Sequence, residues 1–226
     1  DLLARWQADC LDLKPQVEAL WPELTAALEK VLKSTSFILG PEEQQLEKEL
    51  AAKLGVKHAI GCNSGTDALY IALRARGVGP GDEVITTSFT FFATAEAISH
   101  VGATPVFVDI EADSMNLDLS KVEAAITSRT KAIIPVHLFG RPVDLDRLMA
   151  IARQHGLKVV EDCAQSFGAT WKGSQTGVTG ESGCFSFFPT KNLGAYGDAG
   201  LMTTNDDSLA DSMRMLRVHG SRKRYY

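Results

Sequence analysis

The chain has 226 residues, of which 45% are hydrophobic and 23% are charged, and its formal net charge is −5. This composition is typical of a globular protein with one large domain, and the acidic balance argues against nucleic acid as the main partner. The longest apolar runs have the length of a strand, which argues against a membrane span. The four scattered cysteines and the five histidines show no metal-ligand spacing, so we expect no metal site.

Two helices are predicted ahead of the first strand, over residues 17–33 and 42–54. From residue 58 onward, apolar runs of strand length alternate with amphipathic segments. Strands are predicted at 58–62, 83–87, 104–109, 130–137, 157–162, 184–188 and 200–205. Helices are predicted at 66–76, 90–101, 118–126, 144–155 and 207–218.

This alternation predicts the α/β fold class, with a mostly parallel sheet of about seven strands covered by helices on both faces. We therefore expect an N-terminal helical segment over residues 1–56 and a larger ligand-binding domain over 57–226. The N-terminus lacks an initiator Met and the basic start of a secretory signal. Together with the scattered cysteines, this predicts a cytoplasmic protein.

Lys191 lies just after an apolar run, in the segment Ser186-Phe187-Phe188-Pro189-Thr190-Lys191. Most lysines are solvated surface charges, but an amine beside a buried apolar run can have its pKa lowered enough to attack a carbonyl. Such an amine forms Schiff bases, and the commonest cofactor held in this way is pyridoxal phosphate. That cofactor also needs a phosphate cradle, an acid beside its ring nitrogen and a flat partner for its ring.

A phosphate cradle is predicted where Asn63-Ser64-Gly65-Thr66 follows a strand and opens a helix. Small residues let backbone N–H groups reach an anion there, and the helix dipole favours negative charge. Thr66 adds a hydroxyl, and Ser186 can supply a second one. The alternative is that Asn63 or Ser64 only caps the helix.

An acid for the ring nitrogen is predicted at the end of the strand 157–162, where Glu161 and Asp162 point to opposite faces. Asp162 is the one expected to face the crevice, and Gln165 is placed to contact the phenolic oxygen of the ring. A carboxylate that caps the next turn and a solvated glutamine are the alternatives. Phe91, in a segment with two other phenylalanines, is a candidate for the ring face, unless all three belong to the core.

Taken together, these segments resemble the DegT/DnrJ/EryC1/StrS family of pyridoxal-phosphate-dependent nucleotide-sugar aminotransferases of fold type I. The resemblance covers residues 12–226 and is closest to the enzymes that aminate a 3-keto sugar. The matching segments are Phe37-Ile38-Leu39-Gly40-Pro41-Glu42, Asn63 to Leu69, Phe91 to Thr94, Glu161 to Ala169, Ser186 to Gly194, Gly197-Asp198-Ala199-Gly200 and Arg217-Val218-His219-Gly220.

The resemblance implies a role for each matching residue. Lys191 is implied as the catalytic Schiff-base lysine and Asp162 as the catalytic partner of the ring nitrogen. The other implied contacts are Gln165 with the phenolic oxygen, Phe91 with the ring face, Gly65, Thr66 and Ser186 with the phosphate, and Thr190 and Phe37 with the substrate. Some family members are sugar dehydratases that carry histidine in place of the lysine, so Lys191 favours transamination.

The resemblance further implies L-glutamate as amino donor, a UDP- or dTDP-linked 3-keto sugar as acceptor, and a homodimer with shared active sites. The product would be an amino-sugar nucleotide for polysaccharide or antibiotic-sugar biosynthesis. The chain ends directly after a predicted helix, which we interpret as a truncation before the small C-terminal domain of the family. The alternatives are a non-catalytic regulatory or sensor protein on the same fold, a sugar dehydratase, and a plain nucleotide-binding α/β domain, although no Gly-x-Gly-x-x-Gly or Walker loop is present.

Overall fold

The computed structural model describes residues 12–222, so the predictions about the two ends of the chain lie outside the described residues. Its contacts divide the chain into two units, Asp1–Leu46 and Glu47–Tyr226. The boundary predicted between residues 56 and 57 stays a prediction. No helix within residues 12–222 has both the length and the apolar character needed to cross a bilayer.

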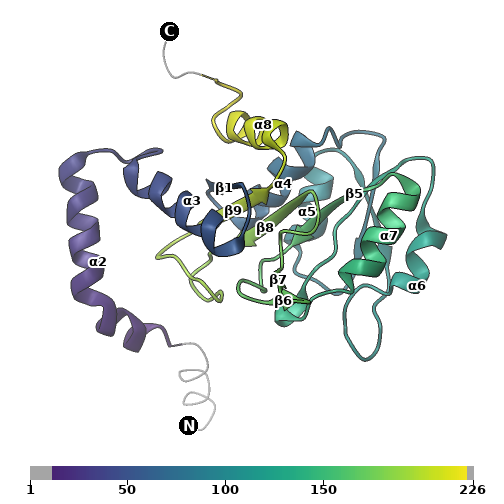
Figure 1. The fold of residues 1–226 in the computed structure, drawn as a ribbon, viewed down its shortest axis with the longest axis horizontal. Coiled ribbons are helices and arrows are strands. Elements are labelled where there is room, and N and C mark those ends of the chain that lie inside the picture. Colours follow the sequence, from purple (N-terminus) through teal and green to yellow (C-terminus); the bar gives the residue numbers. More distant parts are fainter. Residues whose placement is uncertain (1–11, 223–226) are drawn as a thin grey trace. The chain divides into compact units, whose positions relative to one another are not determined.

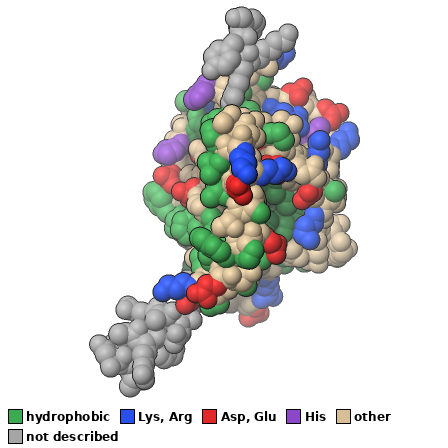
Figure 2. All heavy atoms as spheres, turned by 90° about the vertical axis from the view of Figure 1, so that its left-hand side faces the viewer, with side chains coloured by type: hydrophobic (Ala, Val, Ile, Leu, Met, Phe, Trp, Pro, Cys, Tyr) green, Lys and Arg blue, Asp and Glu red, His purple; other side chains and the backbone are tan. Residues whose placement is uncertain are grey.

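The first unit contains helix α2 (Lys14–Ser34) and the start of helix α3 (Pro41–Leu54). No residue of α2 is buried, and large apolar side chains such as Trp21 and Leu28 are more than half exposed. Figure 2 shows a face on which hydrophobic side chains are scattered among charged ones. Within this unit, Lys30 and Glu42 form an ion pair at 2.7 Å.

The second unit is built on a seven-stranded sheet with the strand order β1-β9-β8-β5-β4-β2-β3 (Figure 1). The strands are β1 (His58–Cys62), β2 (Glu83–Thr87), β3 (Thr104–Val108), β4 (Thr130–Ile133), β5 (Lys158–Asp162), β8 (Ser182–Ser186) and β9 (Gly200–Thr204). Only β9 runs against its neighbours, being antiparallel to both β1 and β8. The prediction of a mostly parallel sheet of about seven strands is confirmed.

Helices cover both faces of this sheet. They are α4 (Gly65–Ala75), α5 (Ala93–His100), α6 (Leu119–Val122), α7 (Leu145–His155) and α8 (Asp207–Arg217), with 3-10 turns η1 (Glu123–Ala125) and η2 (Leu138–Gly140). Neighbouring strand residues pack on opposite faces, because side chains alternate along a strand. Ala132 packs in the cluster with α4, α5 and α8, whereas Ile133 packs in the cluster with α6 and α7. Leu50 and Leu54 of α3 pack with Phe185 and Leu201 in a third cluster.

Several predicted bounds shift by a few residues, such as the strand expected at 184–188, which lies at Ser182–Ser186, and two larger details differ from the sequence-based prediction. The strand expected over 130–137 ends at Ile133, and only a single bridge joins Val136 to Asp162 beyond it. Pro135 has no N–H to continue the ladder, although its carbonyl still accepts from Asp162. A short hairpin of β6 (Thr170–Trp171) and β7 (Ser174–Gln175) was not predicted.

The fully buried carboxylate of Glu161 ties β5 to two loops. Its oxygens accept hydrogen bonds from His137 Nε2 at 2.9 Å and from the amides of Gly177, Thr179 and Gly180 at 2.7–2.9 Å. His137 Nδ1 accepts from the Val143 amide, which leaves the ring proton on Nε2 and the histidine neutral. Burial alone would raise the pKa of Glu161, but the bonds from His137 and the glycine amides hold it below its ordinary value.

We predict that Glu161→Gln lowers the free energy of unfolding by about 3 kcal/mol or more, because the amide group faces several donors with one oxygen fewer and no charge. Urea unfolding measures the loss, and Glu96→Gln on the surface of α5 should stay within about 0.5 kcal/mol of wild type. The wild-type advantage should be complete above the ordinary pKa of 4.5 and should shrink as the pH falls through the lower folded-state value. An advantage that persists unchanged at pH 3 would contradict this account.

Candidate active site

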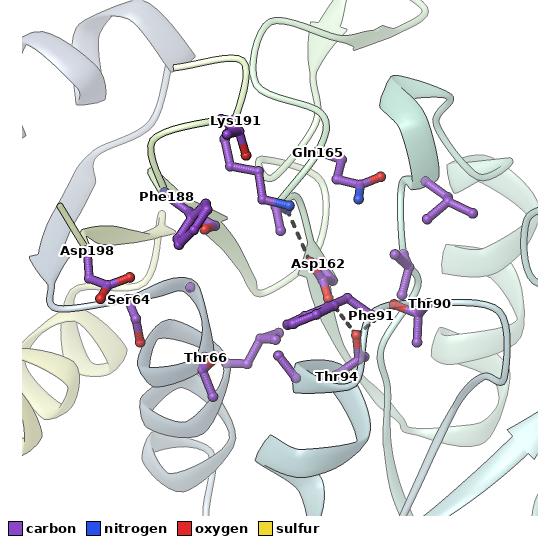
Figure 3. Close-up of a pocket in the computed structure, with 18 residues that line it drawn as sticks. Ser64, Thr66, Thr90, Phe91, Thr94, Asp162, Gln165, Phe188, Lys191 and Asp198 are labelled. Atoms are coloured by element: carbon purple, nitrogen blue, oxygen red, sulfur yellow. Dashed lines mark hydrogen bonds between the residues drawn. The ribbon is translucent and has the colours of Figure 1, made fainter. Parts of the chain in front are cut away.

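A pocket of about 430 Å³ lies at the carboxyl ends of the parallel strands, where ligands gather in sheets of this kind (Figure 3). It lies wholly within the second unit. Of the predicted site residues, it is lined by Gly65, Thr66, Phe91, Asp162, Gln165, Ser186, Thr190 and Lys191. Phe37 belongs to the first unit, and its contact with substrate stays a prediction.

The start of α4 forms the proposed phosphate cradle. Ser64 caps the helix, since its Oγ accepts from the Asp67 amide at 3.0 Å and its carbonyl accepts from Ala68. The amides of Gly65 and Thr66 therefore precede the first helical hydrogen bond and are available to an anion. The capping alternative is correct for Ser64, yet capping leaves these two amides available for a ligand.

Small residues are required around this cradle because three chain segments meet there. A Cβ on Gly65 would lie 2.6 Å from Ser186 Cβ, at the end of β8. A Cβ on Gly200, at the start of β9, would lie 2.2 Å from the Ser64 carbonyl oxygen and 2.9 Å from the Gly65 nitrogen. Both distances are shorter than real Cβ contacts, so any larger residue would displace the turn that carries the amides.

Asp162 is buried at the floor of the pocket, with 5% of its surface exposed. Its Oδ2 accepts from Thr94 Oγ1 at 2.8 Å and its Oδ1 accepts from the Ala164 amide at 3.1 Å. Burial raises the pKa of Asp162 above its ordinary value, and these bonds oppose the rise only in part. Within residues 12–222 it forms no ion pair, so a cationic group in the pocket would stabilise its ionised form. A protonated pyridine nitrogen is such a group, and the residues present fit the cofactor.

Lys191 reaches this pocket from the turn that follows β8, and its side chain extends toward Asp162 in Figure 3. Its backbone amide donates to the Phe188 carbonyl at 2.8 Å, and the Ala195 amide closes the loop onto Phe187 at 2.7 Å. Within the described part of the chain, the Lys191 amine forms no ion pair with a carboxylate. The amine is therefore available to a carbonyl ligand in the pocket.

Gln165 and Phe91 occupy the other walls. Gln165 Oε1 accepts from the Phe139 amide at 3.0 Å, which leaves the Gln165 –NH₂ group to donate to a ligand oxygen. Phe139 has a left-handed backbone, with φ of 54°. Phe91 is 71% exposed at the rim, so the alternative that all three phenylalanines of its segment belong to the core is wrong.

The sequence reasoning assigned no role to several further lining residues, including Thr90, Thr94, Leu138 and Asp198. Thr90 Oγ1 lies 2.8 Å from Thr94 Oγ1, next to Asp162. Asp198 lies in the segment Gly197-Asp198-Ala199-Gly200, which matches the family, so the sequence did contain a signal for this residue. His137, which follows β4, does not line the pocket.

Comparison with known proteins identifies this arrangement. Residues 19–226 match the model of the DegT/DnrJ/EryC1/StrS aminotransferase family. The chain belongs to this family. Pyridoxal phosphate is the cofactor of its aminotransferases, as expected from the resemblance.

Among the curated relatives, the chain is 56% identical to a pleiotropic regulatory protein of Geobacillus stearothermophilus. It is 53% identical to the UDP-N-acetyl-3-dehydro-alpha-D-glucosamine 3-aminotransferase of Acidithiobacillus ferrooxidans. Each alignment covers 96% of this chain and 58% of the relative. The chain thus spans a little over half the length of these curated relatives.

Among solved structures, DesV of S. venezuelae matches with a TM-score of 0.93 and 50% identity over 96% of this chain and 58% of that one. An aminotransferase of the same family from Brucella abortus matches with a TM-score of 0.92 and 46% identity, over 96% of this chain and 60% of that one. The fold-type-I expectation is confirmed.

We predict that Gly200→Ala weakens binding of pyridoxal phosphate about tenfold, because the added Cβ displaces the Ser64–Gly65 turn. Binding of pyridoxal, which lacks the phosphate, should change little. Absorbance titrations of the cofactor-free protein with both compounds measure the difference. Gly79→Ala is the matched control, because its Cβ would meet its nearest neighbours at an ordinary 3.7 Å. An equal loss for pyridoxal and for its phosphate would show that the cradle is not the affected part.

Proposed function

We propose that the protein is a pyridoxal-phosphate-dependent aminotransferase that moves an amino group from L-glutamate to a nucleotide-linked keto-sugar. The observation that carries the proposal is the meeting of Lys191, Asp162, Gln165 and the α4 cradle in one pocket, although they come from separate segments of the chain. When bound, the cofactor supplies an electron sink for the carbon that exchanges the amino group.

In this proposal the chain's own residues hold and orient the cofactor. The amides of Gly65 and Thr66 and the hydroxyl of Ser186 bind the phosphate. Asp162 keeps the ring nitrogen protonated, and Gln165 donates to the phenolic oxygen through its free –NH₂ group. Phe91 lies against the ring face, and Thr190 contacts substrate at the mouth of the pocket. Holding the ring at these points keeps the bond that breaks aligned with the π system.

Lys191 has two roles in the proposed mechanism. Its amine would hold the cofactor covalently and would be free once the amino donor has taken its place. The free Lys191 Nζ would then act as base and acid within each half of the reaction, moving one proton between the substrate carbon and the cofactor.

A homodimer with shared sites is part of the proposal. Glutamate carries two carboxylates and a nucleotide-sugar carries a diphosphate, and both need cationic partners. Among the described residues that line the pocket, Lys191 is the only cationic side chain, and it is committed to the chemistry. Cations for the two substrates then have to come from other parts of the protein or from a second copy.

The names of several relatives support a 3-keto-sugar acceptor. They include a UDP-2-acetamido-2-deoxy-3-oxo-D-glucuronate aminotransferase of Pseudomonas aeruginosa and a dTDP-3-amino-3,4,6-trideoxy-alpha-D-glucose transaminase of Streptomyces venezuelae, each 50% identical to this chain. A role in polysaccharide or antibiotic-sugar biosynthesis and a cytoplasmic location go with this proposal and stay predictions.

A regulatory function is the second candidate, because two relatives carry regulatory or sensory names, the Geobacillus protein and EryC1 of Saccharopolyspora erythraea. A ligand-sensing protein does not need a reactive amine, a ring-nitrogen acid and an amide contact together. The presence of Lys191, Asp162 and Gln165 in one pocket favours the enzyme. Lys191 also argues against the dehydratase alternative, which carries histidine there.

We expect the protein with pyridoxal phosphate to show a visible absorption band that borohydride abolishes, and mass spectrometry should then find the cofactor on the Lys191 peptide. Lys191→Ala should lose the covalent link and amino transfer while it still binds the cofactor noncovalently. Lys131→Ala, on the exposed side of β4, should behave as wild type. Retained turnover in Lys191→Ala, or wild type without a borohydride-sensitive band, would refute the proposal.

The acceptor is tested by incubating the protein with glutamate and a panel of UDP- and dTDP-linked keto-sugars. Glutamate alone should release one 2-oxoglutarate per loaded site, and we expect continued formation of 2-oxoglutarate only with a 3-keto sugar. Transfer to 4-keto sugars alone would contradict the proposed substrate class, and no transfer from a cofactor-loaded protein would favour the regulatory candidate.

A further inference from the structure

A chain of two hydroxyls leads to the buried carboxylate of Asp162. Thr94, in the first turn of α5, is 1% exposed, and its Oγ1 donates to Asp162 Oδ2 at 2.8 Å. Thr90 Oγ1 lies 2.8 Å from Thr94 Oγ1 on the other side. Figure 3 shows the three side chains together at the floor of the pocket. The hydrogen bond between Thr94 and Asp162 joins residues that are 68 positions apart in the sequence.

The chemistry of these groups fixes the direction of the chain. An ionised carboxylate only accepts hydrogen bonds, so the single proton of Thr94 is directed at Asp162. The bond between the two threonines must then use the proton of Thr90. Both hydroxyl dipoles point the same way, and each strengthens the other in favour of negative charge on Asp162.

Burial opposes the ionisation of Asp162, and the two hydrogen bonds and the charge of nearby Lys191 favour it. The titratable groups around it are His137, Lys191, Cys163 and Cys184. His137 is held neutral by its bonds to Val143 and Glu161, and burial raises the thiol pKa of both cysteines well above its ordinary value. Apart from Thr94, the other hydrogen-bond donor to the carboxylate is the backbone amide of Ala164, which no side-chain substitution removes.

The two donors also aim the carboxylate. Ala164 occupies a lone pair of Oδ1 and Thr94 occupies one of Oδ2, so each oxygen keeps an accepting direction for a ligand in the pocket. Thr94 and Thr90 flank Phe91, the proposed partner of the ring face. The same segment therefore sets the position of the ring face and the orientation of the acid for the ring nitrogen.

We propose that Thr94 is a positioning residue that holds Asp162 ionised and aimed at the ring nitrogen of the cofactor, with Thr90 setting the direction of the Thr94 hydroxyl. This inference rests on the proposed function, because its consequence is read on the bound cofactor. Removal of the Thr94 hydroxyl makes Asp162 the stronger base, and the shared proton then moves from the ring nitrogen toward the carboxylate.

The test is the ¹⁵N NMR shift of the ring nitrogen in protein loaded with ¹⁵N-labelled pyridoxal phosphate. Wild type should show a protonated nitrogen at pH 7. In Thr94→Val, which keeps the shape of the side chain, the ratio of the ion pair to the neutral pair should fall about tenfold, and the signal should move toward that of free pyridine. Thr94→Ser should restore the wild-type shift, because it restores the hydroxyl.

Thr86→Val is the matched control. Thr86 is also fully buried and donates to the Ile134 carbonyl at 2.9 Å, so its loss costs a comparable hydrogen bond without touching Asp162. It should leave the ¹⁵N signal unchanged. Thr90→Val, at a partly exposed position, tests the outer link even if Thr94→Val does not fold, and should shift the signal in the same direction by less.

The outcomes separate the two proposals. A wild-type protein that does not bind the cofactor overturns the proposed function. A wild-type protein that binds it with a protonated nitrogen, together with an unshifted signal in Thr94→Val or Thr90→Val, overturns the role of the threonines alone. An equal shift in Thr86→Val would show that the signal follows general destabilisation, and would also overturn it.

Discussion

Two neighbouring buried carboxylates at the end of β5 organise this molecule. Because strand side chains alternate, Glu161 and Asp162 face opposite sides of the sheet, and burying either charge is costly unless it is compensated. Glu161 receives four donors from His137 and three backbone amides, and is complete without a ligand. Asp162 receives two donors and forms no ion pair within residues 12–222. The Glu161 carboxylate holds the loops that contain His137 and Gly177 to Gly180, and the Asp162 carboxylate makes the pocket suited to a positively charged ligand group.

The direction of the strands explains why one pocket collects residues from six segments. Six strands share one direction, so the loops after β1, β2, β4, β5 and β8 meet at one edge. The reversed strand β9 begins at that same edge, which brings Gly200 against the turn of Ser64 and Gly65. The anion cradle therefore depends on one antiparallel strand within an otherwise parallel sheet.

Much of this was predictable from the sequence, and the exceptions have physical reasons. The strands at 58–62 and 83–87 match residue by residue, because turn signals adjoin them, Asn63-Ser64-Gly65 after the first and Gly81-Asp82 before the second. The β6–β7 hairpin has two-residue strands and thus too few residues for any periodic pattern. Asp162 was found because it ends a predicted strand, and Lys191 because it follows one. Thr94 was missed because its contact with Asp162 exists only after a helix and a strand from distant parts of the chain pack together.

The pocket separates the chemistry of the reaction from the choice of substrate. In the proposed function, the cradle amides, Asp162, Gln165 and Lys191 serve features that any pyridoxal phosphate molecule carries: a phosphate, a ring nitrogen, a phenolic oxygen and a carbonyl. Relatives about equally similar to this chain are named for UDP-linked and for dTDP-linked sugars. If the residues that bind the cofactor also recognised the nucleotide, such a range of substrates would require substitutions among those cofactor-binding residues. Among residues 12–222, Lys191 is the only cationic side chain that lines the pocket. Such a pocket leaves recognition of the diphosphate to groups outside it, and these can vary without disturbing Asp162 or its hydroxyl chain.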